Sequence, residues 1–188
     1  MLMEVIRPVW VPLLPRTRPF RIVYSDASVE EGKDPILGWI LLSSSGEVWG
    51  ARTCTLPLNS MPGWKERKTQ ICAAETFCFP AAILDAPVFF AGHDVLWFCD
   101  NEAAVSTIIR GACRPEDING LAEATAILSA KLGARIWVEW IDSKSNPSDG
   151  LSSEGLGDVD YGHIATVARF PDWGAPALYP QKAMTAVL

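Results

Sequence analysis

Residues 20–28 read FRIVYSDAS, and the interpretation of the whole chain starts from this stretch. Bulky and β-branched residues lead directly into Asp26, which has small neighbours on both sides. An apolar run that ends in an acid predicts a buried strand that delivers a carboxylate to the edge of a sheet. Residues 95–100, VLWFCD, have the same pattern and end on Asp100. Because two carboxylates that converge on one spot repel each other unless a cation lies between them, these strands indicate a metal site.

The composition is that of a globular domain with a sizeable core. The chain has 188 residues, of which 49% are hydrophobic and eight are Trp, so we expect one domain, over residues 20–154. Four prolines in residues 1–19 predict an extended arm or a linker. Residues 155–188 lack clear periodicity and predict a tail that packs on the domain. The longest apolar runs are too short to span a bilayer, so we expect no membrane association.

The five cysteines indicate a reducing compartment. Their number is odd, no two of them form a CxxC pair, and most lie in apolar segments. This pattern favours buried, reduced thiols over a disulfide set or a zinc site. The N-terminus lacks a compact apolar region with a small-residue cleavage site, so we expect no secretory signal. The expected location is therefore intracellular, in the cytoplasm or the nucleus.

The net charge of −6 argues against a protein that binds nucleic acid by charge alone, because phosphate contacts need Lys and Arg. It is compatible with an enzyme that holds nucleic acid through metal ions and a few local basic residues. Basic residues do cluster within residues 1–25 and again within residues 65–68. An ordinary solvated surface explains these clusters equally well.

Turn residues and hydrophobic periodicity divide residues 20–154 into alternating elements. We expect strands at residues 20–25, 36–44, 47–53, 94–99 and 135–141. We expect helices at residues 69–84, where Pro80 should kink or end the helix, at 101–110, at 117–132, and from Pro147 onward. Short turns predict an antiparallel meander for the first three strands, and intervening helices predict that the last two run parallel to the first. The expected fold class is α/β, a mixed five-stranded sheet flanked by helices.

Two further acids occupy unusual positions. Glu75 lies mid-helix among small residues, where a carboxylate that faced the sheet would be unfavourable without a partner. Asp149 falls in the first turn of the last helix, where the helix dipole favours the ionised form that a metal ligand needs. Oxygen ligands without His or Cys select Mg²⁺ or Mn²⁺ over zinc. Sites of this kind hold two ions about 3.5–4 Å apart, one activating a water and one stabilising the leaving oxygen of a phosphodiester.

Each acid also has an ordinary explanation. Asp26 fits a turn after a strand, Asp100 or Asp149 fits the start of a helix, and Glu75 would face solvent if the helix phase differed. The simultaneous occurrence of all four in these positions is what favours a common site.

The motifs SDAS, AAET, FCDNEAAV and SKSNPSDGLS, in this order, resemble those of the ribonuclease H-like superfamily. They are most similar to the ribonuclease H domains of retroelement reverse transcriptases, and the resemblance covers about residues 20–153. It implies that Asp26, Glu75, Asp100 and Asp149 are catalytic ligands of two Mg²⁺ or Mn²⁺ ions. It also implies cleavage of the RNA strand of RNA–DNA hybrids, with a polymerase domain as a possible partner.

Recognition of a hybrid requires contacts to phosphates and 2′-hydroxyls. Ser28, Gln70 and Asn101 lie next to the four acids and are candidates for these contacts, although local capping or turn hydrogen bonds explain them at least as well. Many family members have a His in the loop before the last helix, whereas residues 143–146 read SKSN here. The alternatives are another nuclease of this fold, of the DNA exonuclease, resolvase or transposase type, and a catalytically silent scaffold.

Overall fold

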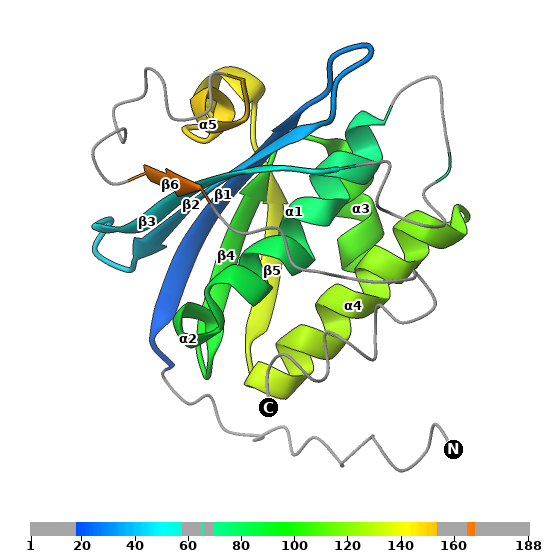
Figure 1. The fold of residues 1–188 in the computed structure, drawn as a ribbon. Coiled ribbons are helices and arrows are strands. Elements are labelled where there is room, and N and C mark those ends of the chain that lie inside the picture. The colour runs from blue at the N-terminus through cyan, green and yellow to red at the C-terminus, as the bar shows by residue number, and fades with distance from the viewer. Residues whose placement is uncertain (1–17, 58–64, 66–69, 154–164, 168–188) are drawn as a thin grey trace.

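The computed structural model describes residues 18–57, 65, 70–153 and 165–167, which form a mixed sheet with helices on both faces (Figure 1). The strand order is β5-β4-β1-β2-β3-β6. The strands are β1 (Phe20–Ser28), β2 (Ile36–Ser43), β3 (Val48–Thr55), β4 (Asp94–Cys99), β5 (Arg135–Trp140) and β6 (Ala165–Val167). β1, β2 and β3 pair antiparallel, and β4 and β5 run parallel to β1. The expected five-stranded sheet is therefore confirmed.

The sheet has one strand more than the sequence indicated. β6 pairs parallel with β3, through Ala51 and Ala165 at one end of the pairing and Thr53 and Val167 at the other. It is too short for its periodicity to be read from the sequence. Residues 1–17 of the expected arm, and the rest of the expected tail over residues 155–188, lie outside the described residues.

The helices follow the predicted order closely. They are α1 (Ile71–Asp85), α2 (Pro87–Phe90), α3 (Glu102–Arg110), α4 (Glu116–Leu132), the 3₁₀ turn η2 (Ser143–Ser145) and α5 (Asp149–Ser153). The predicted caps of α3 are confirmed, because Asn101 Oδ1 accepts the amide of Ala104 and Gly111 ends the helix at φ 65°. The four-residue α2 was not expected. Among the described residues, no helix is long and apolar enough to cross a membrane.

Pro80 does not end α1, contrary to one of the two outcomes that the sequence suggested. A proline inside a helix removes one hydrogen bond and destabilises by about 3 kcal/mol. The turn that follows is fully packed, since Ala81, Ala82 and Ile83 are all buried. Burial of these side chains offsets the lost hydrogen bond, so the helix continues to Asp85.

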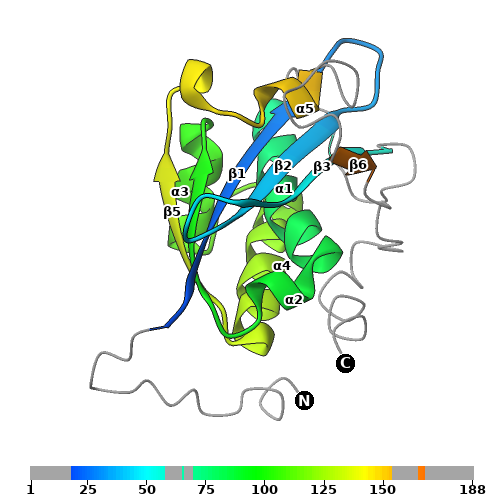
Figure 2. The same cartoon turned by 90° about the vertical axis from the view of Figure 1, so that its left-hand side faces the viewer.

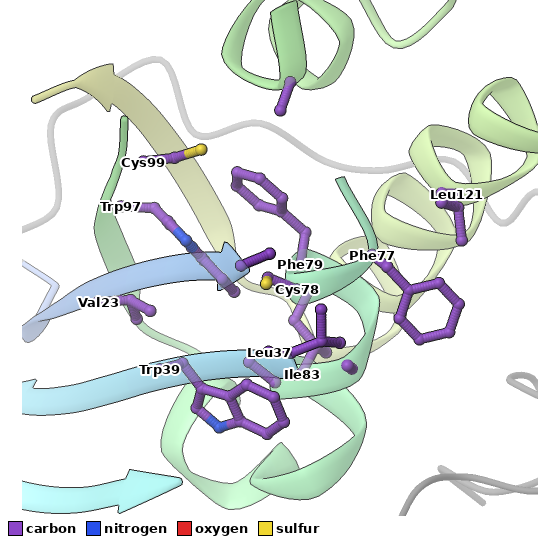
Figure 3. Close-up of a cluster of buried hydrophobic side chains, with 14 of the residues drawn as sticks. Val23, Leu37, Trp39, Phe77, Cys78, Phe79, Ile83, Trp97, Cys99 and Leu121 are labelled. Carbon is purple, nitrogen blue, oxygen red and sulfur yellow. The ribbon is translucent and has the colours of Figure 1, made fainter. Parts of the chain in front are cut away.

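The core lies between the sheet and the layer of α1, α3 and α4 (Figures 1 and 2). Its largest side chains include Trp39 from β2, Trp97 from β4 and Phe79 from α1, which stacks on Trp97 with ring centroids 4.5 Å apart (Figure 3). The five cysteines are free thiols, and three of them are buried. This agrees with the expectation of reduced cysteines in apolar segments.

α5 covers the opposite face of the sheet. Side chains alternate along β2, so that Leu37, Trp39 and Leu41 belong to the main core, whereas Ile40 packs on Leu151 of α5. The closest approach is at Gly38, which pairs with Asp26 in the β1–β2 register. A Cβ at Gly38 would lie 2.7 Å from the Leu151 Cβ and 2.9 Å from the Ser152 nitrogen. Only glycine therefore allows α5 to sit this close to β1 and β2.

Gly38→Ala is expected to lower the free energy of unfolding by about 1–3 kcal/mol, because the added methyl meets backbone and a Cβ that cannot move independently of α5. Urea denaturation would measure the change. Gly50→Ala on β3 is the matched control, since the atoms nearest its Cβ belong to the flexible end of Arg52. Equal losses in the two variants would contradict close packing of α5 at Gly38.

Candidate active site

Asp26 lies near the end of β1 with only 5% of its surface exposed. The pKa of its carboxyl is raised to about 7, mainly by burial and to a lesser extent by the nearby carboxylates of Asp100 and Asp149, whereas a hydrogen bond from Ser152 acts against the shift. The donor is the Ser152 hydroxyl, which contacts Asp26 Oδ2. Asp26 is thus a carboxyl whose ionised form needs a nearby cation.

Glu75 projects from α1 beneath the same end of the sheet and is 2% exposed. Its Oε1 accepts the backbone amide of Ala27 at 3.0 Å, and its Oε2 accepts the Cys99 thiol at 3.6 Å. Burial, followed by repulsion from Asp26 and Asp100, raises the pKa of Glu75 well above its usual value. The helix phase assumed from the sequence is therefore correct, because Glu75 faces the sheet and not solvent.

Asp100 follows directly after β4 and is half-buried. Its backbone carbonyl accepts the indole N–H of Trp140 at 2.9 Å, which ties the end of β5 to the end of β4. Ligand atoms of Glu75, Cys99 and Asp100 all lie within 4.8 Å of one another. Parallel strands β1 and β4 end at the same edge of the sheet, which is why Asp26 and Asp100 meet there, as the sequence predicted.

Asp149 is the first residue of α5 and is exposed. It is close enough to raise the pKa of Asp26, but it does not belong to the compact group of Glu75, Cys99 and Asp100. It therefore stands at the solvent side of the cluster, on an element that reaches the site from the opposite face of the sheet.

Asn146 attaches the loop that precedes α5 to strand β1. Its side-chain amide donates to the Ser25 carbonyl at 3.0 Å, and its Oδ1 accepts the amide and the hydroxyl of Ser148 at 3.2 and 2.6 Å. This is an Asx turn that is also bonded to β1, one residue before Asp26. The sequence interpretation did not single out Asn146 or Ser152. The Asn-Pro-Ser order does signal a turn, but it does not say which strand the turn contacts.

The predicted substrate contacts all have intramolecular partners. Ser28 Oγ donates to the Ser152 carbonyl at 2.5 Å, Gln70 Nε2 donates to the Lys65 carbonyl at 3.2 Å, and Asn101 caps α3. Ser28 is the last residue of β1, and Asn101 follows Asp100 directly after β4. Their contact with a substrate stays a prediction.

The donor chemistry of the cluster suits a hard divalent cation. Carboxylate oxygens are the ligands that Mg²⁺ and Mn²⁺ prefer. Burial raises the pKa of the Cys99 thiol well above its usual value, so this sulfur is a neutral donor to Glu75 and not a thiolate ligand. In the part of the chain that the structure describes, no Lys or Arg forms an ion pair with any of the four acids. The donor set of these acids therefore fits a divalent cation.

Comparison with known proteins identifies the fold. No family model and no curated protein sequence matches the chain. Among solved structures, RNase H1 from the archaeon Halobacterium salinarum is similar over 73% of this chain and 97% of its own, with a TM-score of 0.58 and 19% identity. The N-terminal RNase H domain of a Mycobacterium tuberculosis protein is similar over 73% of this chain and 93% of its own, with a TM-score of 0.59 and 18% identity.

A third similar structure is the foamy viral protease-reverse transcriptase in complex with an RNA/DNA hybrid. It is similar over 81% of this chain but only 22% of its own, with a TM-score of 0.52 and 12% identity. These likenesses show that the chain has the ribonuclease H-like fold. They confirm, at the level of the fold, the resemblance that the four motifs carry.

Proposed function

We propose that the protein is a metal-dependent nuclease that hydrolyses the RNA strand of RNA–DNA hybrids. The observation that supports this most directly is the group of acids at one sheet edge, whose buried carboxyls lack a basic partner among the described residues. A cluster of this kind destabilises the protein, so its presence on a ribonuclease H-like fold points to function. The hybrid bound by the similar reverse transcriptase supports the choice of substrate.

Asp26, Glu75, Asp100 and Asp149 would hold two Mg²⁺ or Mn²⁺ ions. When bound, such ions activate a water molecule and stabilise the leaving oxygen of a phosphodiester. The chain's own contribution is rigidity, because both oxygens of Glu75 are held by hydrogen bonds and Asp26 is fixed by Ser152. Asp149 is the exposed member, which suits it to contact the ion nearer to solvent.

The polymerase partner also belongs to this proposal. On the face of β1, β4 and β5 opposite the main core, Phe20 and Trp137 are exposed, by 46% and 67%, and they line a pocket of about 440 Å³ with Leu96. Exposed apolar surface of this kind is typical of contacts with another protein. The net charge of −6 disfavours binding of a hybrid by charge alone, and a polymerase domain would add basic surface to the complex.

Cleavage of a labelled RNA–DNA hybrid is the test of the proposed function. We expect cleavage of the RNA strand with Mg²⁺ or Mn²⁺ and none with EDTA, and no cleavage of single-stranded RNA, double-stranded RNA or double-stranded DNA. Cleavage of DNA would replace this proposal with a DNA nuclease of the same fold. If no substrate is cleaved and calorimetry detects no divalent cation binding, the chain is a silent scaffold.

A further inference from the structure

The Ser152 hydroxyl links the Asp26 carboxylate on β1 to the backbone of Asp149 at the start of α5. The side chain is fully buried, and its Oγ contacts both Asp26 Oδ2 and the Asp149 backbone carbonyl, the latter at 2.8 Å. A serine hydroxyl has a single hydrogen. When Asp26 is ionised, its carboxylate is the stronger acceptor, so this hydrogen points to β1 and not along α5.

Ser152 is also held through its backbone. Ser28 Oγ donates to the Ser152 carbonyl at 2.5 Å, and the Ser152 nitrogen lies against Gly38. Residues 26, 28 and 38 of β1 and β2 therefore all lie next to Ser152 of the five-residue helix α5. A helix this short has little stability of its own, so these contacts determine where it sits.

We propose that Ser152 is a positioning residue for the metal site, which orients the Asp26 carboxylate and holds α5 so that Asp149 faces the same ions. This inference rests on the proposed function and assigns a role to a residue outside the four acids. Groups that orient metal ligands contribute about 10–100-fold to metal affinity, which sets the size of the expected effect.

The next residue provides a matched control. Ser153 Oγ also donates to the Asp149 carbonyl at 2.8 Å, but the side chain is exposed and, among the hydrogen bonds of the described residues, it makes none with Asp26. Ser153→Ala removes the same kind of bond from the same helix, whereas Ser152→Ala also removes the link to β1. A difference between the two variants therefore reports on that link.

The experiment measures Mn²⁺ and Mg²⁺ binding to the full chain by calorimetry, with the fold checked by circular dichroism in EDTA. Ser152→Ala should weaken binding about 10–100-fold, and Ser153→Ala by less than about threefold. In an Asp26→Asn background, Ser152→Ala should have little further effect on cation binding, because the side chain that Ser152 orients is no longer a carboxylate ligand. Should Ser152→Ala not fold, Ser152→Cys, whose thiol is a weaker donor, should show an intermediate loss.

Three results would overturn the inference. Ser152→Ala that binds Mn²⁺ as tightly as the wild type would show that Ser152 has no role at the site, and would leave the proposed function intact. Equal losses in the Asp26→Asn and wild-type backgrounds would indicate a purely structural role. A wild-type chain that binds no divalent cation would overturn the proposed function and this inference with it.

Discussion

Asp26→Asn is expected to abolish Mg²⁺-dependent cleavage of an RNA–DNA hybrid while the protein stays folded. Bound metal ions stabilise the transition state by several kcal/mol, so loss of a ligand at this site should slow cleavage by at least about 10³-fold. The fold should survive because the amide keeps the size of the side chain and its oxygen still accepts from Ser152. In the absence of metal, the variant should be at least as stable as the wild type, because one source of repulsion at Glu75 is gone.

Initial cleavage rates and thermal melting would check both parts of this expectation. Asp94→Asn is the matched control, since Asp94 lies at the opposite end of β4 and pairs with Arg135 on the surface. Its cleavage rate should equal that of the wild type. Asp26→Asn that cleaves at the wild-type rate would remove Asp26 from the site, and one that unfolds would show that its carboxylate is structural.

The convergence of Asp26, Glu75 and Asp100 could be predicted because it follows from elements with strong sequence signals. β1 and β4 are buried strands of largely apolar residues, with one acid near the end of β1 and another directly after β4, and a parallel pairing brings those ends together. Glu75 stands on a 15-residue helix whose residues 73–83 are all buried, so its burial follows from the position of the helix in the core. Where a position is fixed by the period of a strand or helix, the sequence is sufficient to predict it.

The contacts that hold α5 could not be predicted in the same way. This helix has five residues, too few for a period to define its buried face, and its position depends on Gly38, Ser28 and Asn146. All three are distant from α5 in sequence or precede it in an irregular loop. Their partners emerge only when the sheet is formed, so a turn was apparent in the sequence but its attachment to β1 was not.

The site is unfavourable to the fold that carries it. Glu75 and Asp26 are buried beside other carboxylates, in a region where apolar side chains would pack without electrostatic repulsion. The surrounding core is large and aromatic, with Trp97 stacked on both Phe79 and Phe90. The stability that this core supplies allows the protein to stay folded with these acids in place. A bound divalent cation would restore the free energy of unfolding that their repulsion removes.

Without a divalent cation, the free energy of unfolding is therefore expected to fall as the pH rises from about 5 to 8. Asp26 has a pKa of about 7 in the folded protein against an ordinary value of 3.8. Because the folded state holds this proton more tightly, the contribution of Asp26 is complete below pH 3.8 and is lost as the pH rises through 7. Glu75 acts in the same direction. Asp94 does not contribute in this window, since Arg135 lowers its pKa and its effect appears only in acid.

Mg²⁺ should reverse this loss, and more strongly at pH 8 than at pH 5, because the cation competes with protons for the same carboxylates. At a free Mg²⁺ concentration of about 100 times the dissociation constant, binding adds about 2.7 kcal/mol to the free energy of unfolding. For a chain of this size, that raises the melting temperature by about 5–10 °C. Melting curves at both pH values, with Mg²⁺ or EDTA, would measure the difference. Burial also raises the pKa of Asp85, but this carboxylate pairs with Arg52 outside the acid cluster, so Mg²⁺ should not affect it. The Mg²⁺-dependent part of the change in melting temperature therefore reports on the acid cluster, and Asp26→Asn should make that part smaller. An equal gain at both pH values, or none, would mean that these carboxylates do not bind the cation.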